Sequence, residues 1–228
     1  ALIHDFFNKN DEALIYYQKS LNAFTQPSYR LAEISANAFE RNGNFEKAKD
    51  IYIKFLSDSK DNLLIEKSIK RIEKKEVPKR LILNINDATA ELFSTIASAF
   101  SSDFTNDFSI IYSYFSLYLK KDFEVSQIYL AELLENDSRY LEANNLYENI
   151  KPSSNFFWHS QLRKVRNLEL LGKSEKAIAI LKKMSNEKKE RYDSLKLLGD
   201  IYRNHNKYNE AIEHYNEALS RIEKISSK

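Results

Sequence analysis

The residues of this sequence that could do chemistry are four histidines and many carboxylates, and their spacing predicts no catalytic or metal site. His4, His159, His205 and His214 include no pair at the HExxH spacing, which places two zinc ligands on one helix face. We expect His205 at a turn between helices and His214 on an outer, solvated face. The sequence has no cysteine, which excludes thiolate zinc sites, disulfides and a cysteine nucleophile.

Carboxylate pairs and glycines do not change this interpretation. Glu132 and Glu135 are spaced like ordinary residues on a helix surface, where general acid–base work is not expected. The only glycines are Gly43, Gly172 and Gly199, so the sequence has no glycine-rich loop to hold a phosphate. We therefore predict that the chain is not an enzyme, with no catalytic residue, no metal site and no cofactor.

The composition favours a helical protein without a strongly charged partner. Of the 228 residues, 43% are hydrophobic and 30% are charged, with three Gly, three Pro and a formal net charge of +2. This balance implies no general attraction to polyanions, so nucleic acid is not expected as a partner. The basic stretches 67–80 and 163–191 leave nucleic-acid binding as an alternative. No apolar run approaches the about 20 residues that cross a bilayer, so no transmembrane segment is expected.

Residues 192–225 show a regular pattern of large and small side chains. Positions 7, 8, 11, 17, 20, 24 and 27 of this stretch are Leu198, Gly199, Tyr202, Tyr208, Ala211, Tyr215 and Ala218. The pattern resembles the tetratricopeptide repeat (TPR), a pair of antiparallel helices built from about 34 residues. The resemblance implies two packed helices in this stretch.

The same phase extends backwards along the chain. Steps of 34 residues from Gly199 lead to Val165, Ala131 and Ala97. Small or compact side chains are needed where two helices approach, because a large one would hold the backbones apart. We therefore predict four contiguous repeats, at 90–123, 124–157, 158–191 and 192–225.

The amino-terminal part is expected to hold a truncated repeat followed by a well-matched one at 29–62. The region 63–89 breaks the phase, and it is predicted to contain a lone amphipathic helix and an extended apolar segment at 81–85. The expected organisation is therefore 1–62, 63–89 and 90–225. We expect the break to seal the joint between two helical stacks, with a flexible linker as the alternative. Asp87 is the expected N-cap of a helix that begins near Ala88.

The resemblance implies an all-α fold, a right-handed superhelical solenoid of antiparallel helix pairs with a break at about 63–89. In such solenoids the first helices of the repeats line a concave groove. The resemblance places the following residues there: Arg30, Asn37, Arg41, Ser98, Glu132, Arg166, Lys196, Asp200 and Arg203. The basic clamp by which some TPR domains hold a carboxyl terminus is not reproduced, because Glu33 occupies its Lys position.

The stretch 107–119, DFSIIYSYFSLYL, is apolar on nearly every side. A helix without a polar face is normally covered on both sides, here by neighbouring repeats and the 81–85 segment. Alternatively, Tyr114, Phe115 and Tyr118 form an interface, because aromatic clusters are common anchors at interfaces. Both interpretations stay open at this point.

Charge is segmented along the predicted repeats. Residues 122–148 contain seven acidic residues and only Arg139 as a base, whereas 163–191 contain ten bases and four acids. Such bands could pair between repeats, steer a ligand, or simply form solvated faces.

These observations predict a protein- or peptide-binding scaffold. The alternative is a TPR arm of a larger enzyme or of an envelope-assembly protein, whose active domain lies outside this sequence. The block 90–225 resembles TPR proteins of alphaproteobacteria, so we expect a bacterial piece of a longer multi-repeat chain, cytoplasmic or periplasmic. Exposed repeat ends and the 107–119 helix are candidate contacts for a homo-oligomer.

Overall fold

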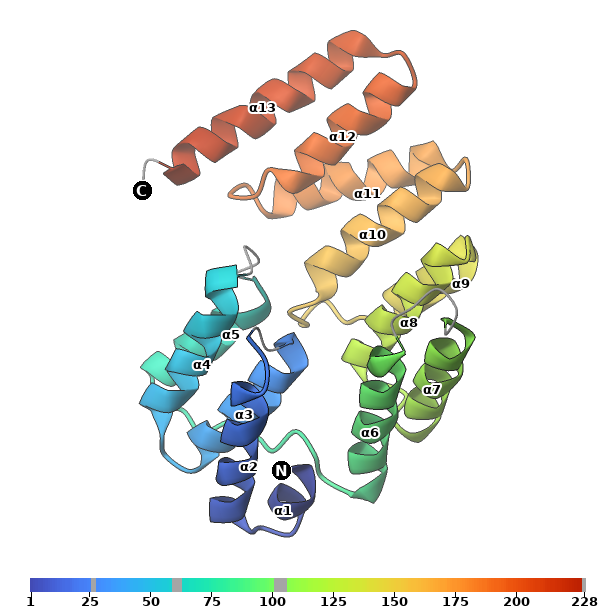
Figure 1. Cartoon of the computed structure of the whole chain (residues 1–228). Coiled ribbons are helices and arrows are strands. Elements are labelled where there is room, and N and C mark those ends of the chain that lie inside the picture. Colours follow the sequence, from blue (N-terminus) through green and yellow to red (C-terminus); the bar gives the residue numbers. More distant parts are fainter. Residues whose placement is uncertain (26–27, 59–62, 101–105, 227–228) are drawn as a thin grey trace. The chain divides into compact units, whose positions relative to one another are not determined.

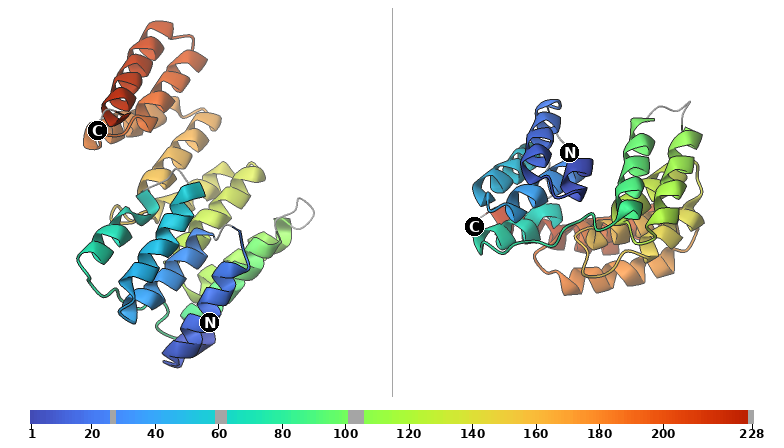
Figure 2. Two further views of the ribbon diagram at one scale, coloured as in Figure 1. Left: turned by 60° about the vertical axis from the view of Figure 1, so that its left-hand side comes forward. Right: turned by 90° about the horizontal axis from the view of Figure 1, so that it is seen from below.

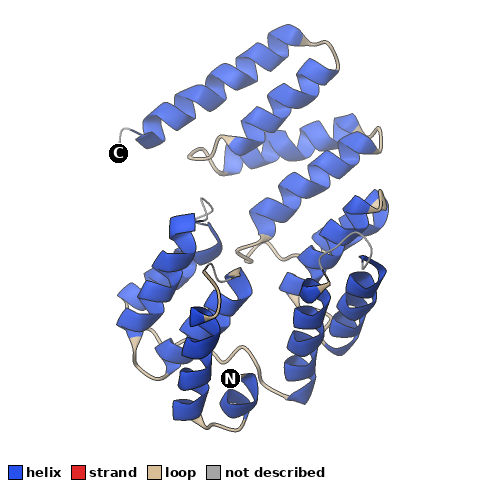
Figure 3. Cartoon of the chain, in the orientation of Figure 1, coloured by secondary structure: helices blue, strands red, loops and turns tan. Residues whose placement is uncertain are grey.

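The computed structural model describes residues 1–25, 28–58, 63–100 and 106–226. Within these ranges the regular structure is entirely α-helical and contains no strand (Figure 3). The predicted all-α class is therefore confirmed.

The described helices belong to two compact units (Figure 1). The first unit comprises residues 1–130 and 153–156, and the second comprises 131–152 and 157–228. The first unit contains α1 (Leu2–Phe6), α2 (Asn10–Asn22), α3 (Tyr29–Arg41), α4 (Phe45–Asp58), α5 (Leu63–Glu73), α6 (Ile85–Ala99), α7 (Asn106–Leu119) and the start of α8 (Glu124–Asn136). The second contains the end of α8 and α9 (Tyr140–Glu148), α10 (Phe157–Leu170), α11 (Ser174–Glu187), α12 (Asp193–Asn204) and α13 (Tyr208–Ser226). The expected break at 63–89 thus lies inside the first unit, and the repeat boundaries stay a prediction.

In the first unit, α3 packs against both α2 and α4. It begins where the Ser28 hydroxyl accepts a hydrogen bond from Leu31 N at 3.2 Å, as N-cap residues do. The chain turns after it at Gly43, whose φ of +76° is the left-handed conformation that favours glycine. A buried cluster surrounds this helix, formed by Leu21, Ala32, Ala36, Phe39, Ala48, Ile51, Tyr52, Phe55, Ile65 and Ile72.

The start of α6 differs from the expectation. The helix begins at Ile85, and its N-cap is Asn84, whose side chain accepts a hydrogen bond from Asp87 N at 2.9 Å. The Asp87 carboxylate in turn accepts from Leu83 N at 2.8 Å. Asp87 is therefore the third residue of the helix in a reciprocal capping arrangement. The prediction that Asp87 is the N-cap was wrong because Asn84, three residues earlier, is also a good capping residue.

The non-helical residues 76–84 between α5 and α6 form a segment that we call the strap. Ile82 is buried, and Leu81 packs against the cluster of Ala13, Tyr17, Ile34 and Ala38. Leu83 and Ile85, in contrast, are exposed. Two of the four aliphatic side chains at 81–85 thus anchor the strap, and the other two are solvated.

Compact side chains lie at the predicted close approaches of the helices. Ala97, Ala131 and Val165 are completely buried, as are Ala143 and Ala177 in the second unit. Gly199 in α12 faces α13, and a Cβ added there would lie only 2.5 Å from the Tyr215 ring. The Tyr215 ring of α13 therefore packs directly on the α12 backbone, because position 199 has no side chain.

A buried ion pair joins α3 to α5. Glu40 has no exposed surface, and both of its carboxylate oxygens accept hydrogen bonds from the Arg71 guanidinium, at 2.8 and 2.9 Å. The hydrogen bond to Glu40 raises the pKa of Arg71. A bidentate pair of this kind compensates the cost of removing the carboxylate from water.

We predict that Gly199→Ala lowers the free energy of unfolding by about 1–2 kcal/mol, because the new methyl group must displace the Tyr215 ring. Urea denaturation measures the change. In a Tyr215→Leu background the same substitution should instead be neutral or stabilising by up to about 1 kcal/mol, since alanine is the better helix former. Stabilisation by Gly199→Ala in the unchanged chain would contradict the close approach.

We predict that Arg71→Met destabilises the first unit by about 3–5 kcal/mol, because it leaves the buried Glu40 carboxylate without its partner. The double variant Glu40→Leu/Arg71→Met should recover much of the loss in the same denaturation experiment. Lys70→Met is the matched control, since the neighbouring pair between Lys70 and Glu66 is solvated and should contribute little.

Candidate ligand-binding face

The three candidate binding residues on α3 are engaged inside the first unit. Asn37 donates a hydrogen bond from Nδ2 to the backbone oxygen of Lys79, at 2.9 Å. Arg41 donates from Nε to Asn37 Oδ1 at 3.0 Å, and it binds both carboxylate oxygens of Asp5 at 2.6 and 2.7 Å. Their polar atoms are thus used by the strap and by α1.

Arg30 is engaged in the same way. Its guanidinium pairs with Glu33 on its own helix and with Glu91 on α6, where Nε lies 3.1 Å from Glu91 Oε2. The guanidinium also lies 5.0 Å from the centre of the Phe123 ring, at the distance of a cation–π contact. Any ligand for this arginine would have to displace these partners.

The strap therefore covers the face of α3 that was expected to bind a ligand. Arg80 holds it at the amino-terminal side, with its guanidinium 2.8 Å from Asn8 Oδ1 and 3.3 Å from Asp5 Oδ1. At the other side, Lys120 Nζ lies 3.2 Å from Asp87 Oδ1 and 3.4 Å from the Leu81 carbonyl oxygen. Sequence reasoning missed these contacts, because the strap has no repeat pattern that would show where it packs.

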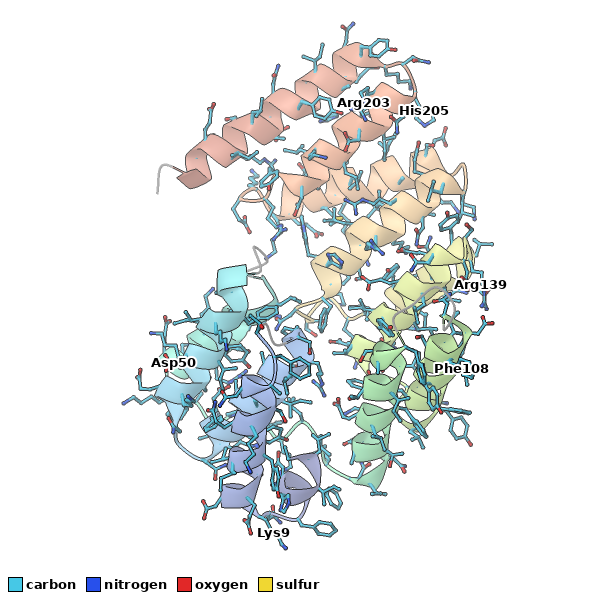
Figure 4. The ribbon with its side chains drawn as sticks, viewed as in Figure 1. Lys9, Asp50, Phe108, Arg139, Arg203 and His205 are labelled. Carbon is cyan, nitrogen blue, oxygen red and sulfur yellow. The ribbon has the colours of Figure 1, made fainter. Side chains whose placement is uncertain are left out.

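In the second unit, α10 and α12 lie side by side in the same direction. Near their beginnings, Trp158 Nε1 lies 3.0 Å from the Asp193 carboxylate. Near their ends, His205 Nε2 lies 2.7 Å from Glu169 Oε1 (Figure 4). The paired residues are 35 and 36 positions apart, which is close to one repeat. These contacts fix the two first helices in register.

The remaining candidates on these helices are accessible. Arg166 on α10 and Lys196 on α12 are exposed. Arg203 on α12 is also exposed (Figure 4). Asp200 lies between the last two, with its carboxylate 3.2 Å from Lys196 Nζ and 3.7 Å from Arg203 Nη2. It also accepts a hydrogen bond from the Tyr215 hydroxyl at 2.8 Å. We call Arg166, Lys196, Asp200 and Arg203 the α10–α12 face. It contains three basic residues and one acidic residue, Asp200, which is paired within the face and with Tyr215.

Glu132 lies on α8, a helix that is not part of this face. Its carboxylate is 3.9 Å from Arg163, which pairs more closely with Glu135. Burial raises the pKa of Glu132 above its ordinary 4.5, Arg163 opposes the shift, and Glu135 adds to it. Glu135 also accepts a hydrogen bond from Asn167 at 2.7 Å. The acidic and basic bands of the sequence thus do pair between repeats at Arg163.

Ser98 and the predicted interface residues lie in the first unit. Ser98 is exposed on α6, and its hydroxyl donates to Thr95 O at 2.8 Å. Tyr114, Phe115 and Tyr118 on α7 are also exposed, so the described part of the chain does not cover them. The 81–85 segment and the neighbouring helices therefore leave one face of α7 open.

The histidines do not converge on a site. His4 stacks on Tyr16, with the ring centres 4.9 Å apart, and His214 stacks on Tyr202 at 5.3 Å. His214 is thus half-buried against α12, so the expectation of an outer, solvated face was wrong for it. Among the described residues, no group of three or more histidine, aspartate or glutamate side chains is placed to hold a metal ion. None of the described helices is both long and apolar enough to cross a membrane.

Comparison with known proteins supports the repeat and the fold. A tetratricopeptide repeat family model matches residues 192–224. A crystal structure of MamA is similar, with a TM-score of 0.52 and 13% identity, over 85% of this chain and 97% of that one. MamA MSR-1 C2 gives a TM-score of 0.51 and 12% identity, over 93% and 98% of the two chains. The MamA RS-1 ArsTM double mutant gives a TM-score of 0.51 and 12% identity, over 90% of this chain and 100% of that one.

Identities this low show the shared fold and nothing further. No curated protein sequence is significantly similar to the chain. The family match and the fold nevertheless agree with the buried small residues and with the register of α10 and α12. Residues 192–224 therefore match a tetratricopeptide repeat, and the chain as a whole has an all-helical fold similar to that of MamA.

Proposed function

We propose that the protein is a non-enzymatic scaffold that binds a protein or peptide along the α10–α12 face. The observation that carries this proposal is the pair of first helices held in register at both ends, with Arg166, Lys196 and Arg203 left accessible. A fixed spacing between two helices favours recognition, because little conformational entropy is lost when the ligand binds.

The charge of this face indicates the chemistry of the ligand. The face has three exposed basic residues. Its one acidic residue, Asp200, already accepts a hydrogen bond from the Tyr215 hydroxyl and pairs with Lys196. A peptide with carboxylate side chains would therefore meet a complementary surface. The α3 face is a weaker candidate, because a ligand there would have to displace the strap.

We predict that the triple reversal Arg166→Glu, Lys196→Glu and Arg203→Glu abolishes the capture of partners by the immobilised 228-residue chain. The matched control reverses Lys176, Lys183 and Lys189, which are exposed in the same unit but lie outside α10 and α12. Both triples change the net charge equally, so only a site on the α10–α12 face distinguishes them. Partners should be identified by mass spectrometry, and their binding should weaken as salt rises. Capture that survives the first triple, or is lost equally in the control, would contradict the proposal.

The raised pKa of Glu132 predicts a pH effect on the stability of the second unit. A carboxyl whose folded pKa exceeds its unfolded value holds more protons in the folded state, so its ionisation lowers the free energy of unfolding as pH rises above 4.5. Glu132→Gln should therefore stabilise the chain relative to wild type at about pH 7, and less so at about pH 4.5.

Glu142→Gln is the control of opposite sign for this pH effect. The hydrogen bond from Arg139 lowers the pKa of Glu142, so its ionised form stabilises the folded chain and this contribution is lost as pH falls. The variant should therefore lose stability relative to wild type as pH rises. Urea denaturation across this pH range measures both, and parallel changes in the two variants would contradict the assignment.

A further inference from the structure

α7 has its small polar residues inside and its aromatic residues outside. Ser109, Ser113 and Ser116 are buried, and each hydroxyl donates to a backbone oxygen of the first unit. Ser109 bonds Ala97 O at 2.9 Å, and Ser116 bonds Ala90 O at 2.8 Å. These short side chains bring α7 close to α6, and the two helices lie side by side in the right-hand view of Figure 2. Phe108, Tyr114, Phe115 and Tyr118 are exposed on the opposite side, whereas Tyr112 is half-buried.

The outward face has two rows at helical spacing. Its exposed fractions are Phe108 53%, Ile111 46%, Tyr114 44%, Phe115 49% and Tyr118 83%. Residues three, four and seven apart share one side of a helix, so these five form one continuous surface. We call them the α7 aromatic surface, and Phe108 marks its amino-terminal end (Figure 4).

A row of packed aromatic rings lies beneath part of this surface. Phe100, the residue directly after α6, lies 5.7 Å from Phe108 and 5.8 Å from Tyr112, measured between ring centres. Phe93 lies 6.0 Å from Tyr112 and 5.5 Å from Phe115. Two of the five surface residues, Phe108 and Phe115, are thus packed against rings beneath them. Side chains held in this way lose less conformational entropy on binding.

The charge of this surface restricts its partner. From Phe108 to Leu119 the sequence contains no charged residue. A partner that placed charges here would bury them without counter-charges, which is costly. A second copy of the same surface introduces no charge, and it brings aromatic rings that can pack edge to face.

The area of the surface is also sufficient for a pair. With about 150–250 Å² for each aromatic side chain, the exposed fractions correspond to roughly 500 Å² per copy. Two copies would bury about 1,000 Å², which is about the area at which specific interfaces begin. We therefore expect a weak, concentration-dependent dimer, because this area lies at the low end of the range for specific interfaces.

We propose that two copies of the chain associate through the α7 aromatic surface, with their α7 helices antiparallel across a two-fold axis. A two-fold axis brings identical patches together. The centre of α7 lies between Ile111 and Tyr114, so these residues would lie near the axis. The Phe108 end of the surface in one copy would then lie opposite the Tyr118 end in the other. This interface is separate from the α10–α12 face and does not depend on ligand binding there.

Sedimentation velocity over about 1–100 µM chain tests the proposal, with circular dichroism to confirm that each variant is folded. The wild-type chain should form dimers in this range. Tyr114→Lys and Tyr114→Glu should each weaken association by at least roughly 100-fold, because like charges then meet near the axis. An equimolar mixture of the two variants should dimerise again, since opposite charges now meet. This rescue would not follow from a merely structural role of Tyr114.

Ile212→Lys is the matched control, because Ile212 is an equally exposed aliphatic residue on α13, at 57% exposure. It should leave dimerisation unchanged. The proposal is overturned if wild type stays monomeric at about 100 µM, or if Ile212→Lys and not the Tyr114 variants breaks the dimer. It is also overturned if monomeric wild type, but not Tyr114→Lys, sediments with phosphatidylcholine vesicles, which would assign the surface to lipid.

Discussion

The close approach of paired helices is the constraint on which the rest of each unit depends. Gly199 allows it between α12 and α13, and the serines of α7 allow it against α6. Where two backbones meet at this distance, a large side chain has no room and must lie elsewhere. In α12 the large residues fill the gaps towards the neighbouring helices. In α7 too few neighbours are available, so its aromatic side chains form a surface.

Polar contacts then decide which of the first-helix faces stays accessible. On α3, the strap and α6 occupy the side chains of Asn37 and Arg30. On α12, the ends of the helix are tied to α10, while Lys196 and Arg203 between them remain solvated. The first-helix faces of α3 and α12 therefore have different roles in the two units. A buried pair holds the fold together, whereas an exposed base can contribute to recognition.

Much of the fold could be predicted from sequence, because paired helices need compact residues at regular intervals along the chain. Ala97, Ala131 and Val165 occur at such an interval, and all three are buried. The strap and the pair between Glu40 and Arg71 could not be predicted, since a contact between distant segments leaves no local pattern. A signal was available for α7: serines at 109, 113 and 116 share one helix face, which indicates where that helix approaches another. For the candidate site, sequence located the accessible bases of α12 but could not tell that α3 is covered.

The strap has a consequence for how the chain reaches its folded state. Its unit is held by contacts between residues far apart in sequence, such as Arg30 with Glu91 at 61 positions and Asn155 with Leu64 at 91. The contacts between repeats in the second unit, such as Glu169 with His205, span about one repeat. Contacts between distant residues stabilise the chain only after a long loop has closed, which costs conformational entropy. Neighbouring repeats, in contrast, can pack one after another. We therefore expect the first unit to form later and as a whole, and the second to form and unfold stepwise, one repeat after another.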